Sequence, residues 1–172
     1  MQKLSLFVYA APSGEKIPAV VVPATASDFS ATKNWQTSWT TRAVQSMPNK
    51  VALKRADDGE LLGLMSYKAE DSILAVEIIY IESAAHSNAN LLHKTGTEKK
   101  YVDIARALFA YAVSVSLEAG YGGVLVFKAK NDDLLEYYMK EFGAVQVGRY
   151  DPYRLVIWED EAEEIISAYR EE

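Results

Sequence analysis

The spacing of apolar residues predicts strands at the start and in the middle of the chain. Short runs rich in valine, leucine, alanine and aromatic residues occupy 4–10 and 16–24, and the letters PSGE between them are typical of a turn. Three further runs of this kind occupy 50–56, 61–70 and 72–83. The letters DDGE separate the first two, which we interpret as a hairpin, and the third run continues an antiparallel meander.

The segment 26–47 has a different pattern, in which aromatic residues are spaced along a polar background. Ser27 and Asp28 near its start are candidate helix caps, and Pro48 follows its end. The segment therefore predicts one or two short helices.

Three later segments also have helical spacing. The longest predicted helix covers 101–120, where apolar residues recur at helical spacing, and Gly120 is expected to end it. A shorter helix is predicted over 131–143, and a terminal amphipathic helix is predicted over 159–172.

Apolar strands are predicted between and after these helices, over 122–130, 144–150 and 153–160. The order is thus antiparallel strands, a central helix, a buried strand, a helix and two more strands. This order predicts an α+β domain with a mixed sheet and a right-handed crossover at its middle.

Composition narrows the classes of partner. The 172 residues include 18 basic and 24 acidic side chains, which gives a net charge of −6. This balance argues against broad attraction to nucleic acid or to an anionic membrane, and it favours cationic partners. The absence of cysteine excludes disulfides and a thiolate nucleophile. The first apolar run is too short to span a bilayer, so we expect a cytoplasmic protein in which residues 1–172 form one domain.

Four stretches carry a family resemblance through their order and spacing: AVEIIYIES, IARALFAYAVSVSLEAGYGG, VLVFKAKN and LLEYYMKEFGA. From about Val51 to Tyr169, the chain resembles the GNAT superfamily of acetyl-CoA-dependent N-acetyltransferases. The resemblance implies a GNAT-like mixed, mostly antiparallel sheet, flanked by helices, with a splayed central pair of strands. Residues 1–50 would supply N-terminal strands and acceptor-side helices, and residues 51–172 would supply the CoA-binding core with the C-terminal strands and helix.

In that family, the loop before the central helix reads Gln or Arg, two residues, Gly, one residue, then Gly or Ala. Its backbone amides hold the pyrophosphate of CoA. The matching letters here are KYVDIA, with a lysine in the basic position and Asp103 where the first glycine is usual. The resemblance therefore implies a pyrophosphate site made of Lys100, Tyr101, Val102, Asp103, Ile104 and Ala105.

Asp103 is the main departure from the family pattern. A carboxylate about 5 Å from a phosphate charge costs roughly 1 to 3 kcal/mol at an effective dielectric between those of bulk water and a protein surface. Lys94, Lys99 and Arg106 lie close in sequence and could offset this repulsion. The alternative is structural: an aspartate in a first helical turn stabilises the helix dipole, and residues 95–98 form an ordinary capping box.

The resemblance also indicates catalytic residues. Glu77 matches the glutamate general base of histone-type members, which works through a water. Its alternative is a solvent-facing position or a pair with a lysine, and Glu82, on the opposite face, is a weaker candidate base. Tyr138 resembles the tyrosine that protonates the CoA sulfur. Tyr137 is an alternative because neighbouring helix positions point about 100° apart, and either ring could simply pack the helix on the sheet.

Further coenzyme contacts follow from the same resemblance. Main-chain groups at the end of the strand hold pantetheine and the thioester in the family, and the matching residues are Tyr80, Ile81, Glu82 and Ser83. Asn131 resembles a CoA-contacting asparagine, and its alternative role is to cap the next helix.

The sequence thus predicts an N-acetyltransferase that moves an acetyl group from acetyl-CoA directly to a primary amine of a small molecule or protein. We place the acceptor pocket between the segment of Trp35 and Trp39 and the sheet. The alternative, motivated by Asp103, is a degenerate GNAT-fold binding or interaction module with weak or absent CoA binding. His86 and His93 lie in a polar loop, so we expect surface histidines and no metal. We expect no nucleic-acid or membrane partner, and a homodimer is left open.

Overall fold

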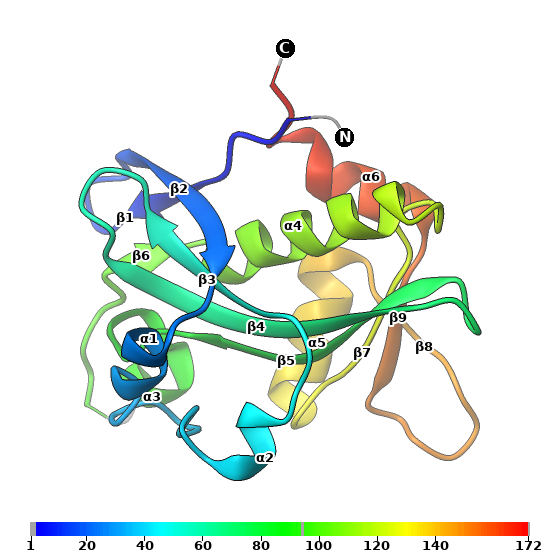
Figure 1. Ribbon diagram of the computed structural model, residues 1–172, viewed down its shortest axis with the longest axis horizontal. Helices are drawn as coiled ribbons and strands as arrows, with labels where there is room; N and C mark the ends of the chain where they lie inside the picture. Colours follow the sequence, from blue (N-terminus) through cyan, green and yellow to red (C-terminus); the bar gives the residue numbers. More distant parts are fainter. Residues whose placement is uncertain (1–2, 94, 172) are drawn as a thin grey trace. The chain divides into compact units, whose positions relative to one another are not determined.

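The structure is a computed structural model that describes residues 3–93 and 95–171 (Figure 1). The described chain forms two compact units. What we call the N-terminal unit consists of 5–66, 80–93 and 95–108, and the C-terminal unit consists of 3–4, 67–79 and 109–171. Two strands and one helix continue from one unit into the other: β4 (Leu61–Glu70), β5 (Ala75–Ser83) and α4 (Ile104–Glu118).

Within the described residues, nine strands pair in the order β6-β1-β2-β3-β4-β5-β7-β9-β8. The remaining strand bounds are β1 (Phe7–Ala10), β2 (Lys16–Pro23), β3 (Lys50–Arg55), β6 (Tyr101–Val102), β7 (Leu125–Lys128), β8 (Val145–Gln146) and β9 (Arg154–Ile157). β5 and β7 are parallel, whereas β1–β2, β1–β6, β2–β3, β3–β4, β7–β9 and β8–β9 are antiparallel. The predicted mixed, mostly antiparallel sheet is confirmed.

The parallel ladder between β5 and β7 is short. Its register contains Val76 opposite Leu125 and Glu77 opposite Val126. β5 then continues as far as Ser83. The two strands thus pair only near the start of β5, which is the splayed central pair that the resemblance implied.

Two short helices precede β3 in the N-terminal unit, as predicted: α1 (Ala26–Ser30) and α2 (Arg42–Gln45). Their N-caps are Thr25 and Thr41, whose hydroxyl oxygens accept backbone amides three residues on. The suggestion that Ser27 or Asp28 caps the first helix is therefore wrong.

Asp28 has a different role, because it is the third residue of a capping box. Its carboxylate accepts the amide of Thr25 at 2.8 Å and pairs with the Lys54 ammonium at 2.9 Å. These contacts fasten α1 to β3.

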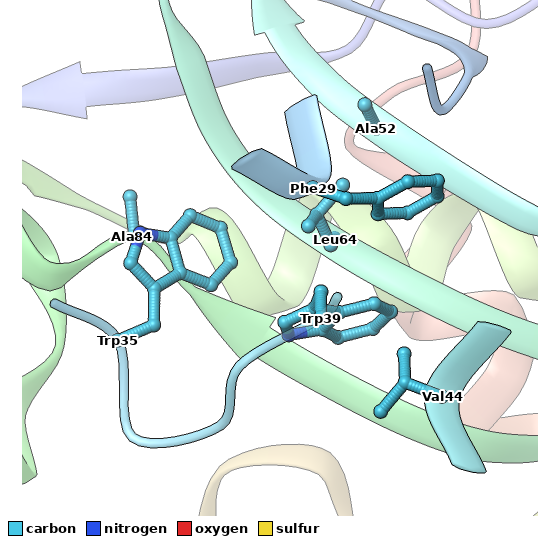
Figure 2. Close-up of a cluster of buried hydrophobic side chains, with 7 residues drawn as sticks. All are labelled: Phe29, Trp35, Trp39, Val44, Ala52, Leu64 and Ala84. Carbon is cyan, nitrogen blue, oxygen red and sulfur yellow. The ribbon is translucent and has the colours of Figure 1, made fainter. Parts of the chain in front are cut away.

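Aromatic side chains from this helical segment pack on β3 and β4. The buried cluster consists of Phe29, Trp35, Trp39, Val44, Ala52, Leu64 and Ala84 (Figure 2). Trp39 is fully buried, and its ring meets that of Tyr80 edge to face at 5.6 Å. The cluster fixes the connection between α1 and α2 against the N-terminal unit.

The chain between β5 and α4 contains three elements that the sequence did not predict: the short helix η1 (Ala85–Ser87), the helix α3 (Ala89–His93) and the strand β6. Tyr101 was expected to begin the central helix, but it pairs with Ala10 in β6, and α4 begins at Ile104. Residues 95–98 therefore precede a strand, and their interpretation as a capping box for this helix is wrong.

In the C-terminal unit, α5 (Asp132–Phe142) and α6 (Glu159–Ser167) form as predicted. α5 ends at Gly143, whose φ of 66° is the left-handed conformation that glycine adopts without strain. Among the described residues, no helix combines the length and apolar character needed to cross a lipid bilayer.

Candidate functional site

The residue before α4 has the backbone conformation of a glycine. Asp103 has a φ of 71°, which is rare for residues other than glycine, asparagine and aspartate. Its carbonyl accepts the amide of Ala107 at 3.1 Å, so the helix starts directly after this turn. The resemblance implied a glycine here, and Asp103 adopts a left-handed conformation that glycine adopts without strain, while adding a carboxylate.

Gly63 in β4 allows the start of α4 to approach the sheet closely. A β-carbon at this position would lie 3.0 Å from the carbonyl oxygen of Glu82, 3.0 Å from Ile104 and 3.2 Å from Leu108. The glycine therefore brings the first turn of α4 next to the end of β5. These are the two segments that the sequence analysis assigned to the pyrophosphate and to pantetheine.

Side chains fasten the residues that precede α4. Lys100 donates to Glu60 at 2.7 Å, and the Tyr101 hydroxyl donates to the other oxygen of the same carboxylate. Burial works to raise the pKa of Glu60, but the hydrogen bonds from Lys100 and Tyr101 outweigh it and hold that pKa below its usual range. The cation predicted to face phosphate is therefore already paired.

His86 belongs to the same group of contacts and is half-buried, so the expectation of a surface histidine is wrong for it. Its Nδ1 lies 2.7 Å from the Ser87 hydroxyl, and its Nε2 lies 3.3 Å from the Leu61 carbonyl. Burial lowers the pKa of His86, which favours the neutral ring with Nε2–H donating to Leu61. His93 is exposed, as expected.

Backbone donors in the predicted pyrophosphate loop divide into two sets. The amide of Lys100 donates to the His86 carbonyl at 2.9 Å, and that of Tyr101 donates to the Ser87 hydroxyl at 3.0 Å. The amides of Ile104 and Ala105 lie in the first turn of α4, where no acceptor exists within the helix. A phosphate at this loop would meet the second set and the positive end of the helix dipole.

The end of β5 faces the connection between α1 and α2. Glu82 is 4% exposed, and its Oε2 accepts the amides of Gln36 and Thr37 at 2.8 and 3.4 Å. The Tyr80 hydroxyl lies 2.5 Å from that of Thr37. Ile81 lies between Tyr80 and Glu82 and Ser83 follows them, and both Ile81 and Ser83 are half-buried.

Glu77 lies in the part of β5 that belongs to the C-terminal unit, in the last pair of the parallel ladder. It is half-buried. Its charge contributes to the raised pKa of Lys68, after the larger effects of the hydrogen bond and charge of Glu70. Glu77 therefore has a lysine nearby, as the structural alternative proposed, and it also borders the point where β5 and β7 part.

Tyr138 is buried in an aromatic cluster of the C-terminal unit. Its ring meets Phe109 at 5.7 Å and Phe127 at 5.1 Å, both edge to face. Burial, with a smaller effect from the neighbouring Tyr137, raises the pKa of Tyr138 to about 12. The phenol therefore keeps its proton at neutral pH, whereas Tyr137 is 41% exposed on the helix surface.

Asn131 caps α5 in the same unit. Its side-chain oxygen accepts the Leu134 amide at 2.9 Å, as its structural alternative proposed. The predicted coenzyme contact would then have to use the amide nitrogen. Lys94 lies outside the described residues, and within them no three histidine or acidic side chains form a group that could hold a metal ion.

Several residues of this region were not found from the sequence. Glu60, Gly63 and Thr37 contribute through long-range contacts, and only Gly63 left a signal, as a glycine inside the apolar run LLGLM. Such a glycine indicates close backbone approach.

No protein-family model and no curated protein sequence matches the chain. Solved structures do match it. A GNAT-family acetyltransferase from Listeria monocytogenes 4b F2365 is 12% identical, with a TM-score of 0.56 over 87% of this chain and 98% of that one. The KacTA–DNA complex gives 14% identity and a TM-score of 0.57 over 87% and 99% of the two chains. The structure of AtaTR bound with AcCoA is 14% identical, with a TM-score of 0.56 over 86% of this chain and 97% of that one. At such identities the likeness is one of fold, and at that level it confirms the resemblance.

Proposed function

We propose that this chain, which has the fold of the GNAT acetyltransferases, transfers an acetyl group from acetyl-CoA to a primary amine. The observation that carries the proposal is the φ of 71° at Asp103, directly before α4. This left-handed conformation is the one that glycine adopts without strain, and it supports the proposal that the amides at the start of α4 hold a diphosphate even though the side chain is acidic.

In the proposed reaction, the acceptor nitrogen attacks the thioester carbonyl, a C–N bond forms and the C–S bond breaks. Glu77 takes a proton from the amine through a water, and Tyr138 gives its proton to the departing thiolate. The pKa of about 12 means that the phenol is protonated when the thiolate forms, but it also makes Tyr138 a weaker proton donor than an ordinary tyrosine. Main-chain groups from Tyr80 to Ser83 would hold pantetheine, and Asn131 would contact the coenzyme.

The acceptor side would include the connection between α1 and α2, because the buried cluster around Trp35 and Trp39 already fills the space between this segment and β3 and β4. The net charge of −6 favours a cationic amine, on a small molecule or on a protein. The same charge disfavours nonspecific binding to nucleic acid, although two of the similar structures are complexes with DNA. A cytoplasmic location, the absence of a membrane partner and a homodimer remain predictions from the sequence.

A binding module without catalysis is the second candidate. Two observations favour it: Asp103 adds a negative charge to the loop proposed to bind phosphate, and Lys100 is already held by Glu60 at 2.7 Å. The charge of Asp103 and the pairing of Lys100 would both weaken phosphate binding, and so they oppose the stabilisation that the helix amides would provide.

Calorimetric titration with acetyl-CoA separates the two candidates. We expect micromolar binding by the native chain, and binding about tenfold tighter for Asp103→Asn, which keeps the shape and removes the charge. Asp103→Gly should bind at least as tightly. Asp160→Asn, an exposed change on α6, serves as the control and should bind like the native chain. Binding that appears only in the Asp103 variants would support the module, and no binding by any variant would reject both the coenzyme and the enzyme.

A further inference from the structure

The connection between α1 and α2 is anchored by side chains at the end of β5. Glu82 accepts two successive backbone amides through one oxygen, from Gln36 at 2.8 Å and from Thr37 at 3.4 Å. Tyr80, two residues earlier and therefore on the same face of the strand, shares a 2.5 Å hydrogen bond with the Thr37 hydroxyl. The Asn88 side chain adds a 3.2 Å bond to that of Gln36. One strand face thus fixes residues 36 and 37.

An anchor made by a buried carboxylate depends on its hydrogen bonds. Glu82 is 4% exposed, and a buried charge is costly unless hydrogen bonds replace the water that it loses. Bonds from backbone amides to a carboxylate are charge-assisted and roughly twice as strong as bonds between neutral groups. The anchor therefore depends on Glu82 as the common acceptor of both amides, and a glutamine, which presents an NH₂ group beside its oxygen, is expected to weaken it.

The anchored segment holds Trp39 in a fixed position. The Trp39 amide donates to the Thr32 hydroxyl at 3.0 Å, and its carbonyl accepts from the Gln45 side chain at 2.6 Å. Its indole N–H is buried and has no hydrogen-bond acceptor within residues 3–93 and 95–171. Buried donors of this kind are rare in native proteins and call for an explanation, such as a role in binding. Because the Trp39 ring is fully buried, this donor lies inside the segment, and the link between the segment and the acceptor rests on its hydrogen bonds to the end of β5, which is proposed to hold the thioester.

We propose that Glu82 is a positioning residue for the amine acceptor. By holding Gln36 and Thr37, it fixes the Trp35–Trp39 segment that forms the acceptor side of the site. The inference rests on the proposed function for the identity of that ligand. It gives the side chain of Glu82 a role distinct from that of a general base, while its main-chain groups remain proposed pantetheine contacts. Acceptor affinity should therefore depend on Glu82, and acetyl-CoA affinity should not.

Amide hydrogen exchange tests the anchor without any need for activity. In Glu82→Gln, we expect the Gln36 and Thr37 amides to exchange about tenfold faster than in the native chain, and the amides of α5 to be unchanged. Tyr80→Phe should speed exchange at Thr37 less strongly. Glu164→Gln, an exposed change on α6, is the matched control. If the glutamine variant does not fold, Glu82→Asp keeps the charge and withdraws it by one methylene. Unchanged exchange at both amides would overturn the inference.

Steady-state kinetics tests the link to the acceptor, with ethylamine, spermidine and a lysine-containing peptide as probes. In Glu82→Gln, the KM for the accepted amine should rise about tenfold, with kcat and the Kd for acetyl-CoA within about twofold of the native values. A loss of kcat at constant KM would make Glu82 a base, and a loss of acetyl-CoA affinity would make its side chain a coenzyme contact. Either result would overturn the inference. Failure of the native chain to bind acetyl-CoA would instead reject the proposed function, and the exchange data would then still decide the anchor.

Discussion

Burial keeps the Tyr138 phenol protonated and makes it a weaker acid than an ordinary tyrosine. The ring is enclosed by Phe109, Phe127 and Phe142, and the loss of water disfavours the phenolate. The same packing satisfies the structural alternative, in which Tyr138 only joins α5 to the sheet. The two roles are therefore compatible, and only kinetics separates them.

Tyr138→Phe removes the proton and keeps the ring. We expect kcat for acetyl transfer to fall about a hundredfold, with little change in acetyl-CoA affinity. Because the pKa of Tyr138 is raised to about 12, deprotonation of this group should not lower the native rate at any pH below about 11. Tyr137→Phe, at the exposed neighbour, is the control and should keep kcat within about twofold of the native value. An unaltered kcat in Tyr138→Phe would leave the ring with packing alone.

Asp103 shows what can be predicted for a single residue. Its charge and its place in the loop were evident from the letters KYVDIA, and so was the conflict with a phosphate. Its left-handed backbone was not evident, because that conformation depends on where β6 ends and α4 begins. Likewise, the Lys100–Glu60 pair joins residues 40 positions apart, and no local pattern indicates it.

At the scale of elements, periodicity found every long helix and strand and missed the short elements between β5 and α4. β6 contains two residues and exists through its pairing with β1, so its sequence alone resembles the start of the next helix. α3 lies in a polar stretch without a clear apolar period. The boundary at Ile104 was missed for the same reason, since tertiary pairing overrides local preference there.

Gly63→Ala tests how closely α4 must approach β4. The added β-carbon would meet the Glu82 carbonyl and Ile104 at 3.0 Å, and backbone cannot yield as a flexible side chain can. We expect the free energy of unfolding to fall by about 1–3 kcal/mol, and acetyl-CoA to bind more weakly because the first turn of α4 is displaced. Urea denaturation and calorimetry measure the two effects.

Gly59→Ala is the matched control for that change. Nothing lies within 4 Å of its added β-carbon, but its φ of 78° is unfavourable for alanine. It should lose about 1 kcal/mol of stability and keep its affinity for acetyl-CoA. Equal affinities in both variants would mean that the position of the first turn does not matter for the coenzyme.

The cap of α5 offers a further test. Asn131→Ala removes the acceptor of the Leu134 amide and should lower the free energy of unfolding by about 1 kcal/mol, whereas Asn131→Ser keeps a capping oxygen and should cost less. Acetyl-CoA titration of the serine variant then isolates the proposed coenzyme contact. Native affinity in that variant would remove Asn131 from the site.

At the scale of the whole molecule, carboxylates held by hydrogen bonds make the free energy of unfolding depend on pH. Burial acts to raise the pKa of Asp28, but hydrogen bonds from Lys54 and Thr25 outweigh it and hold that pKa below its usual value. The pKa of Glu60 is lowered in the same sense. A lowered folded-state pKa stabilises the protein above the unfolded-state pKa, and this stabilisation is lost as the pH falls through the folded-state value.

We therefore expect the free energy of unfolding to decrease steadily from about pH 5 to about pH 3, as measured by urea denaturation at each pH. Lys54→Gln removes the main partner of Asp28, so it should be less stable at neutral pH and lose less on acidification. A native stability that is flat across this range would show that neither carboxylate is held as described.

Three stretches of backbone, β4, β5 and α4, each belong to both compact units. A break at the boundary between Leu108 and Phe109 would interrupt the hydrogen bonds of α4, so each fragment would contain only part of that helix. The folding of one half is therefore committed to that of the other, and we expect the chain to melt in one step rather than two. Surface loops of such a molecule can be exchanged, whereas neither compact unit can be replaced as a separate module, because β4, β5 and α4 belong to both.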